Sequence, residues 1–376
     1  MSGRKHVWWI AGTALFLMVV AGLIVRLQVI RRDVERWESY QQECRFRGED
    51  LGIEAWLPPK VADADNAFAH PWMRGFLTGK VSPEAESIEA LQASPGLGLD
   101  DYEVWQDVEN HKLWFDDRPV ERNRVLEACR AHAKDLDAIH EMAARPSARL
   151  EADLSGGYES SYGLSSNPTQ IGHVLGLHAA AALSAGDEPA AVADLEALLR
   201  LGSHFRSQNF LLPQVVGAGM EAGALSVIEA GAARNAFSAD SKQRLRAARR
   251  SRKIEDDLAS CWRGERGMFL QMLRKVVETG DRSDSRLRID FLMPPERLRA
   301  VNALAFCEIL DPALAPPVSL AGWQDFERRT ALIRDDKDSD DPAQLARMSL
   351  MMTGGIVGGM LVQEEDMDRV FKLLDP

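Results

Sequence analysis

The sequence predicts an all-α fold, in which an N-terminal transmembrane helix precedes an irregular, tetratricopeptide-like domain of helical hairpins. Three observations predict it: an uncharged apolar run near the N-terminus, apolar residues that recur every three or four positions, and few segments that alternate apolar and polar residues. With 376 residues, of which 45% are hydrophobic and 27% charged, the chain is long and apolar enough to bury a sizeable core.

The first expected element is a transmembrane helix over the uncharged run at 7–25. At 1.5 Å per residue, a helix of this length nearly crosses a hydrocarbon layer of about 30 Å. Trp8, Trp9 and Arg26 mark its two ends, where amphipathic and charged side chains favour the membrane interface. Because a cleaved signal peptide has a shorter apolar core and a small-residue cleavage site, we expect an uncleaved, single-pass anchor that follows a short basic tail at 1–6.

Charges around the anchor leave two orientations open. Arg4 and Lys5 precede the run and four arginines follow it, at 26, 31, 32 and 36, so a Lys/Arg count places the large domain inside the cell. Long domains, however, cross membranes largely regardless of charge, and a short basic tail is typical of a signal anchor. We therefore expect the bulk of the chain to be periplasmic or extracytoplasmic.

After the anchor, the pattern predicts a charged helical stalk at 26–56 and a helical domain at 57–376. Leu57-Pro58-Pro59 is expected to end the stalk, since proline removes a hydrogen-bond donor and restricts the residue before it. Turn and cap residues, including Gly186-Asp187 and Ser238, divide the domain. The helices expected are Pro119–Ala144, Thr169–Ser184, Glu188–Phe205, Pro213–Gly231 and a long one that runs from Ser238 toward Gly280.

Composition and motifs limit the partners and cofactors. Lys and Arg total 45 against 57 Asp and Glu, a net charge of -12, which argues against a protein that binds nucleic acid through its phosphates. The sequence lacks a Gly-rich phosphate loop, a Gly-x-Ser-x-Gly elbow and a dinucleotide fingerprint, so we expect no cofactor. The four cysteines, at 44, 129, 261 and 307, lack zinc-site spacing, so we expect no metal site. Cys129 and Cys307 lie among apolar residues, and we expect them to be buried free thiols rather than partners in a disulfide.

Short motifs follow one another in a definite order through residues 40–280. They are Arg47-Gly48-Glu49, Leu57-Pro58-Pro59, Asn66-Ala67-Phe68, Pro71, Arg145-Pro146-Ser147-Ala148-Arg149, Gly186-Asp187, Phe210-Leu211-Leu212-Pro213-Gln214-Val215-Val216 and Arg263-Gly264-Glu265-Arg266. In this order the chain resembles an uncharacterised family of membrane-anchored, mostly helical proteins from planctomycete- and verrucomicrobia-type bacteria. The resemblance implies a helical architecture and a cell-envelope setting, and it implies no activity.

Several segments resemble functional motifs but lack a residue that the motif requires. His140-Glu141 begins a zinc-protease motif, yet Ala144 stands where the second histidine ligand is needed. The acidic segment at 335–341 lacks the glycine and the glutamate of a calcium loop, so we interpret it as a solvated loop. The apolar run at 348–362 contains two overlapping GxxxG pairs, and its small residues favour close packing of buried helices over a second membrane span.

The strongest candidate site is the charged segment that holds Arg263, Glu265 and Arg266 between apolar residues. Buried charges are costly unless they are paired, so we expect a structural ion-pair network that includes these residues or Arg149. The function predicted is a non-enzymatic interaction or scaffold module that is attached to the membrane through 7–25 and binds another envelope protein. The alternative is a membrane-tethered, hydrolase-like enzyme with its site around Arg263–Arg266.

Overall fold

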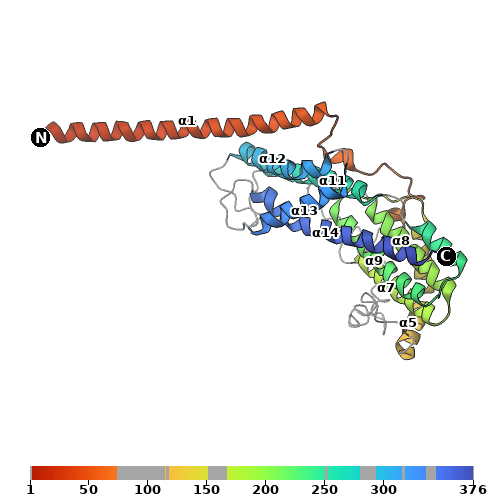
Figure 1. Ribbon diagram of the computed structural model, residues 1–376. Helices are drawn as coiled ribbons and strands as arrows, with labels where there is room; N and C mark the ends of the chain where they lie inside the picture. The colour runs from red at the N-terminus through yellow and green to blue at the C-terminus, as the bar shows by residue number, and fades with distance from the viewer. Residues whose placement is uncertain are drawn as a thin grey trace.

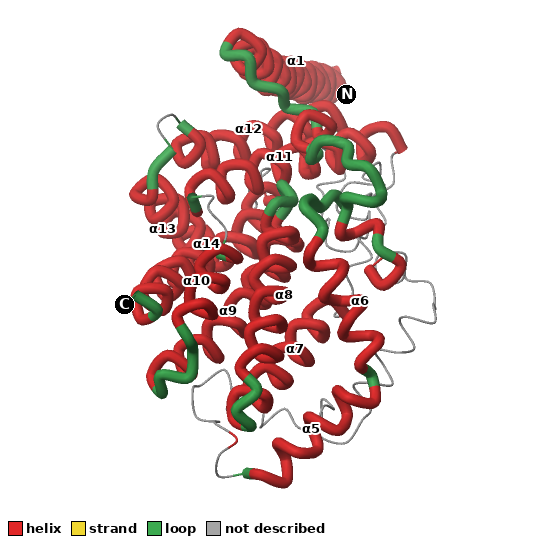
Figure 2. Tube along the Cα trace, turned by 90° about the vertical axis from the view of Figure 1, so that its right-hand side faces the viewer, coloured by secondary structure: helices red, strands yellow, loops and turns green. Residues whose placement is uncertain are grey.

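The computed structural model describes residues 2–73, 115, 118–150, 167–249, 253–279, 294–315, 318–335 and 344–375. Within these ranges every regular element is a helix, and the only β-type pairing is an isolated parallel bridge between Asn66 and Ser147. Figure 2 shows helices joined by short loops throughout the described chain. The all-α prediction is confirmed.

Helix α1 (Ser2–Phe46) is one continuous helix of 45 residues that projects from the rest of the molecule (Figure 1). It ends ten residues before the stalk boundary expected at 56, and a separate 3-10 turn, η1, follows at Ile53–Trp56. The reason is Gly48, whose φ of +72° suits a residue without a Cβ. The Gly48 and Glu49 amides donate to the carbonyls of Arg45 and Cys44, which closes the helix as a Schellman motif.

The second half of α1 is packed onto the domain, so the expected boundary between a stalk and a domain at residue 57 is not a structural one. Trp37 and Cys44 are buried, at 4% and 0% exposure. Arg36 pairs with Glu308 at 2.9 Å, and the Tyr40 hydroxyl donates to Asp311 at the same distance. Both partners lie on α12 (Pro295–Leu314), so contacts along several turns hold α1 and α12 together.

The first hydrophobic core lies among α5 to α10, together with the second 3-10 turn, η2 (Ala67–Ala69), and the C-terminal end of α14. Helix α8 packs against α6, α7, α9 and α10 and is the centre of this half. The expected helix at 119–144 is divided at His132, whose Nδ1 lies 3.1 Å from the Asp135 carboxylate. The helices are α5 (Pro119–Ala131), α6 (Ala133–Ala144), α7 (Asn167–Ser184), α8 (Glu188–Arg206), α9 (Leu211–Ala233) and α10 (Ala239–Ala248).

Local signals set several of these helix ends as predicted. Gly186 has φ +79° and closes α7, and the Asp187 side chain accepts from the Ala190 amide at the start of α8. Ser238 caps α10 through the Ser241 amide. The long helix expected from Ser238, however, ends at Ala248, and a new one begins at Ile254 with three acidic residues in its first turn, where the helix dipole favours them.

The second hydrophobic core joins the docked part of α1 to the C-terminal helices. Trp262, Trp323 and Phe326 pack edge to face within it. Helix α14 packs against α9, α12 and α13, so the run at 348–362 belongs to this bundle. The helices are α11 (Ile254–Thr279), α12 (Pro295–Leu314), α13 (Leu320–Asp335) and α14 (Gln344–Leu373). The acidic segment expected at 335–341 falls outside the described residues after Asp335.

One helix among the described residues, α9, is long and apolar enough to cross a membrane. Its most apolar window is 72% buried inside the bundle, which is typical of a core helix. Gly217 lets α9 approach α8 closely, because a Cβ on it would stand 2.5 Å from the Gly202 carbonyl oxygen of α8. Gly219, by contrast, faces open space. The prediction that Cys129 and Cys307 are buried free thiols is confirmed, and Cys44 and Cys261 are buried free thiols as well.

Candidate functional site

The charged segment around Arg263–Arg266 lies on α11 where three other parts of the chain meet. A Cβ on Gly264 would overlap the main-chain carbonyl of Asn209, in the α8–α9 loop. A Cβ on Gly267 would stand 2.9 Å from the Cα of Ile53 in η1. The two glycines therefore let a loop and a 3-10 turn approach α11 closely, and the charged side chains between them reach different neighbours.

Glu265 caps the N-terminus of a neighbouring helix, α9. Its side chain is 2% exposed, and Oε1 accepts a hydrogen bond from the Leu211 amide at 2.7 Å. Leu211 is the first residue of α9, and its own N-cap residue, Phe210, has no side chain that can accept. The carboxylate thus satisfies an amide that has no partner within its helix and lies at the positive end of the α9 dipole.

Arg266 forms a buried ion-pair cluster with residues that the sequence did not connect to it. Its side chain is 0% exposed and contacts Glu49 Oε1 at 2.5 Å and Asp311 Oδ1 at 3.4 Å. Burial opposes the charge on Arg266, but Cys307 and Glu49 more than offset it and raise its pKa. Burial likewise works against ionised Glu49, yet the Arg266 guanidinium lowers the pKa of that carboxyl below its usual value.

The other two predicted residues make contacts of a different kind. The Arg263 guanidinium stands 5.5 Å from the ring centre of Trp56, a cation–π contact, and burial lowers its pKa. Arg149 is held through its main chain: its amide donates to the Asn66 side chain and its carbonyl accepts from it, at 2.8 and 3.0 Å. The four predicted residues therefore make contacts with different parts of the chain.

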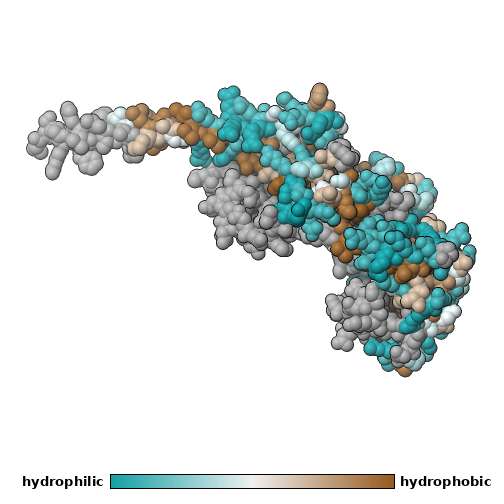
Figure 3. Space-filling view, viewed as in Figure 1, coloured by the Kyte–Doolittle hydropathy of each residue, from teal (hydrophilic) through white to brown (hydrophobic). Residues whose placement is uncertain are grey.

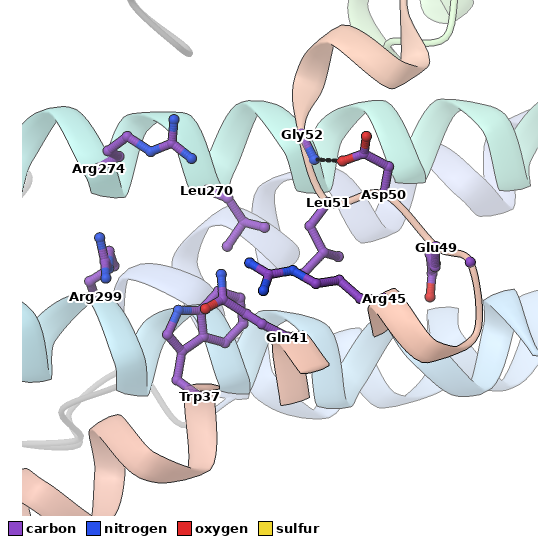
Figure 4. Close-up of a pocket in the computed structure, with 11 residues that line it drawn as sticks. Trp37, Gln41, Arg45, Glu49, Asp50, Leu51, Gly52, Leu270, Arg274 and Arg299 are labelled. Carbon is purple, nitrogen blue, oxygen red and sulfur yellow. Dashed lines mark hydrogen bonds between the residues drawn. The ribbon is translucent and has the colours of Figure 1, made fainter. Parts of the chain in front are cut away.

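Next to this cluster lies a pocket of about 510 Å³ between α1, the loop at 48–52, α11 and α12 (Figure 4). We call it the arginine pocket, because Arg45, Arg274 and Arg299 enter it from three different helices. Figure 4 shows Arg45 reaching in from one side and the other two arginines standing opposite, with Trp37 beneath them. Glu49, the partner of Arg266, also lines this pocket and so joins it to the buried cluster.

The two acidic side chains at the rim of the arginine pocket have partners outside it. Glu49 contacts Arg266 and also Arg47 at 3.3 Å. Asp50 Oδ1 accepts from the Gly52 amide at 2.7 Å. The three arginines make no ion pair or hydrogen bond with any residue that the structure describes, which leaves an excess of positive charge in the pocket.

Two buried polar networks were not predicted from the sequence. Arg206, 1% exposed, contacts Glu221 at 2.8 Å and lies 3.8 Å from Asp257. Asp194, 0% exposed, lies 2.8 Å from His140 and 2.7 Å from His178. Each network includes a carboxylate that has apolar residues on both sides in the sequence, Glu221 in α9 and Asp194 in α8. That signal was available and indicates a paired, buried charge.

Glu49→Gln is expected to lower the free energy of unfolding by about 1 to 3 kcal/mol at pH 7, because it weakens a charge-assisted bond to a buried guanidinium. The folded-state pKa of Glu49 is lowered, so its contribution is present above the unfolded pKa of about 4.3 and is lost as pH falls through the folded value. Denaturant unfolding at pH 7 and in acid measures this, with Glu38→Gln as the exposed control on α1. A difference that stays constant with pH would contradict the ionic role.

Comparisons with known proteins bear on none of these assignments. No protein-family model, no curated protein and no solved structure matched the chain. The residues and the fold are therefore the basis for any functional conclusion.

Proposed function

We propose that the chain is a membrane-anchored helical module of the cell envelope that acts by binding another envelope protein rather than by catalysis. The observation that carries this proposal is the exposed apolar surface of α1. Large apolar side chains there are between 38% and 66% exposed; they are Phe16, Leu17, Met18, Val19, Leu23, Ile24, Val25, Leu27 and Val29. Figure 3 shows them as a brown band on the projecting helix.

The distribution of these side chains favours lipid over a protein partner. Phe16 to Val19 are four consecutive residues, and at about 100° per residue they cover the whole circumference of the helix. A helix that is apolar on every side needs an apolar surrounding on every side, as a bilayer provides. A partner helix would instead leave a polar face. This argument supports an anchor at 7–25, whereas α9, the other long apolar helix, already has its surroundings within the bundle.

The contacts of Arg263–Arg266 favour binding over the enzymatic alternative. A catalytic group needs to reach a substrate, but Glu265 and Arg266 are almost fully buried and engaged with Leu211 and Glu49. Burial also raises the pKa of the nearby Cys261 thiol, which therefore stays protonated and is a poor nucleophile. We therefore assign the segment a structural role in the proposed module.

If the domain lies outside the cell membrane, thiols placed on its surface are expected to be labelled from outside. The four native thiols are buried, so they should contribute little to the labelling. Glu278→Cys on α11 and Arg130→Cys on α5 place single thiols at exposed positions. In intact spheroplasts both variants are expected to react with a membrane-impermeant maleimide, whereas the wild-type chain gives only background. Labelling that requires permeabilised cells would contradict the external orientation and place the domain in the cytoplasm.

A further inference from the structure

In the arginine pocket, three guanidiniums from different helices share a cavity and make no ion pair with a described carboxylate. Arg45 lies in the last turn of α1, Arg274 on α11 and Arg299 on α12. The Nε of Arg299 is buried and has no hydrogen-bond partner among the described residues. The chain has a net charge of -12, so a cavity lined by three arginines indicates a site for a negatively charged ligand.

We propose that the arginine pocket binds an anion of the phosphate or diphosphate type, presented from the water side of the membrane. Guanidinium groups bind phosphate oxygens through paired, charge-assisted hydrogen bonds, and three of them match the several oxygens of a diphosphate. A volume of about 510 Å³ lies in the range of ligand pockets and leaves room for a group attached to the phosphate. The rim carboxylates are turned to Arg266 and to the Gly52 amide, so they leave the guanidiniums to the ligand.

The length of α1 separates a water-side ligand from a lipid of the same bilayer, and this step rests on the proposed anchor. If the helix leaves the hydrocarbon at Arg26, then Trp37 and Arg45 stand about 17 and 29 Å above it along the helix axis. The headgroup layer is only about 5 to 7 Å thick. A typical tilt of about 20° shortens these heights by only a few per cent. Because α1 is continuous through Phe46, the pocket lies beyond the reach of ordinary lipid headgroups.

The test measures inorganic pyrophosphate binding to the full chain in phosphatidylcholine nanodiscs by titration calorimetry. The wild-type chain is expected to bind with an affinity that falls as salt is added. Arg45→Gln, Arg274→Gln and Arg299→Gln are each expected to weaken binding about tenfold or more, and the triple variant to abolish it. Arg130→Gln on α5, an exposed arginine at the other end of the molecule (Figure 1), is the matched control and should bind as wild type does.

Three results would overturn the proposal. They are the absence of binding by the wild-type chain, binding that survives in the triple variant, and competition from phosphatidic acid added to the nanodisc, which would identify a lipid headgroup as the ligand. Thermal melting of the variants guards against misfolding and is expected to stay unchanged, since the arginines make no ion pair in the described chain. A pocket without affinity leaves the anchor unaffected, because anchoring is measured by membrane extraction.

Discussion

Glu265→Ala is expected to lower the free energy of unfolding of the full chain by about 2 to 4 kcal/mol. The substitution leaves the buried Leu211 amide without its acceptor, which costs about 1 to 3 kcal/mol, and removes a negative charge from the positive end of α9. Leu211 and Glu265 are both buried, at 6% and 2% exposure, so water is poorly placed to replace the lost acceptor. In detergent, the melting temperature of a chain of 376 residues should fall by about 3 to 5 °C.

Two variants separate this helix-capping role from other effects. Glu265→Gln keeps an oxygen that can accept from Leu211 and is expected to recover part of the lost stability. Glu278→Ala removes an exposed carboxylate from the same helix and should change the unfolding free energy by less than about 0.5 kcal/mol. A Glu265→Ala chain that melts at the wild-type temperature would contradict the structural role and would justify a screen for hydrolase activity.

The parts of the fold that the sequence predicts are those with local causes. Gly186, Asp187 and Ser238 act on residues within one turn of themselves, so their effects follow from the sequence alone. Gly48 belongs to the same class, and the end of α1 at Phe46 could have been predicted from it. The start of α11 also has a local signal, since its acidic first turn, Glu255 to Asp257, is typical of a helix N-terminus, and the prediction of one long helix from Ser238 does not include it.

The site was less predictable because its contacts join segments far apart in the chain. The segment at 263–266 stands out as charge among apolar residues, and burial of Glu265 and Arg266 follows from that. The identity of the partners does not: Arg266 contacts Glu49, 217 residues away, and Glu265 contacts a main-chain amide, which carries no sequence signal. The arginine pocket is hidden for the same reason, since its arginines come from three helices that no local pattern brings together.

Arginine substitutions in the proposed anchor at 7–25 are expected to raise the free energy of inserting α1 into the membrane. Leu17 and Leu23 are 59% and 53% exposed on α1, so replacing both by arginine disturbs no packing in the domain. Leu17 lies near the middle of 7–25, where an arginine costs about 2.5 to 3.5 kcal/mol on insertion scales. Leu23 lies near the end of the run, where an arginine costs about 0 to 1 kcal/mol, and the loss of each leucine adds a few tenths. The combined penalty, about 3 to 6 kcal/mol, is large enough to weaken insertion strongly.

Carbonate extraction of membranes is the measurement that decides this claim. The wild-type chain is expected to stay in the pellet at alkaline pH, and the Leu17→Arg/Leu23→Arg variant to leave it. Val120→Arg/Leu212→Arg places the same charges on exposed apolar positions of α5 and α9 and should fractionate as wild type does. Release of the wild-type chain by carbonate, or retention of the Leu17→Arg/Leu23→Arg variant at wild-type levels, would contradict an anchor at 7–25.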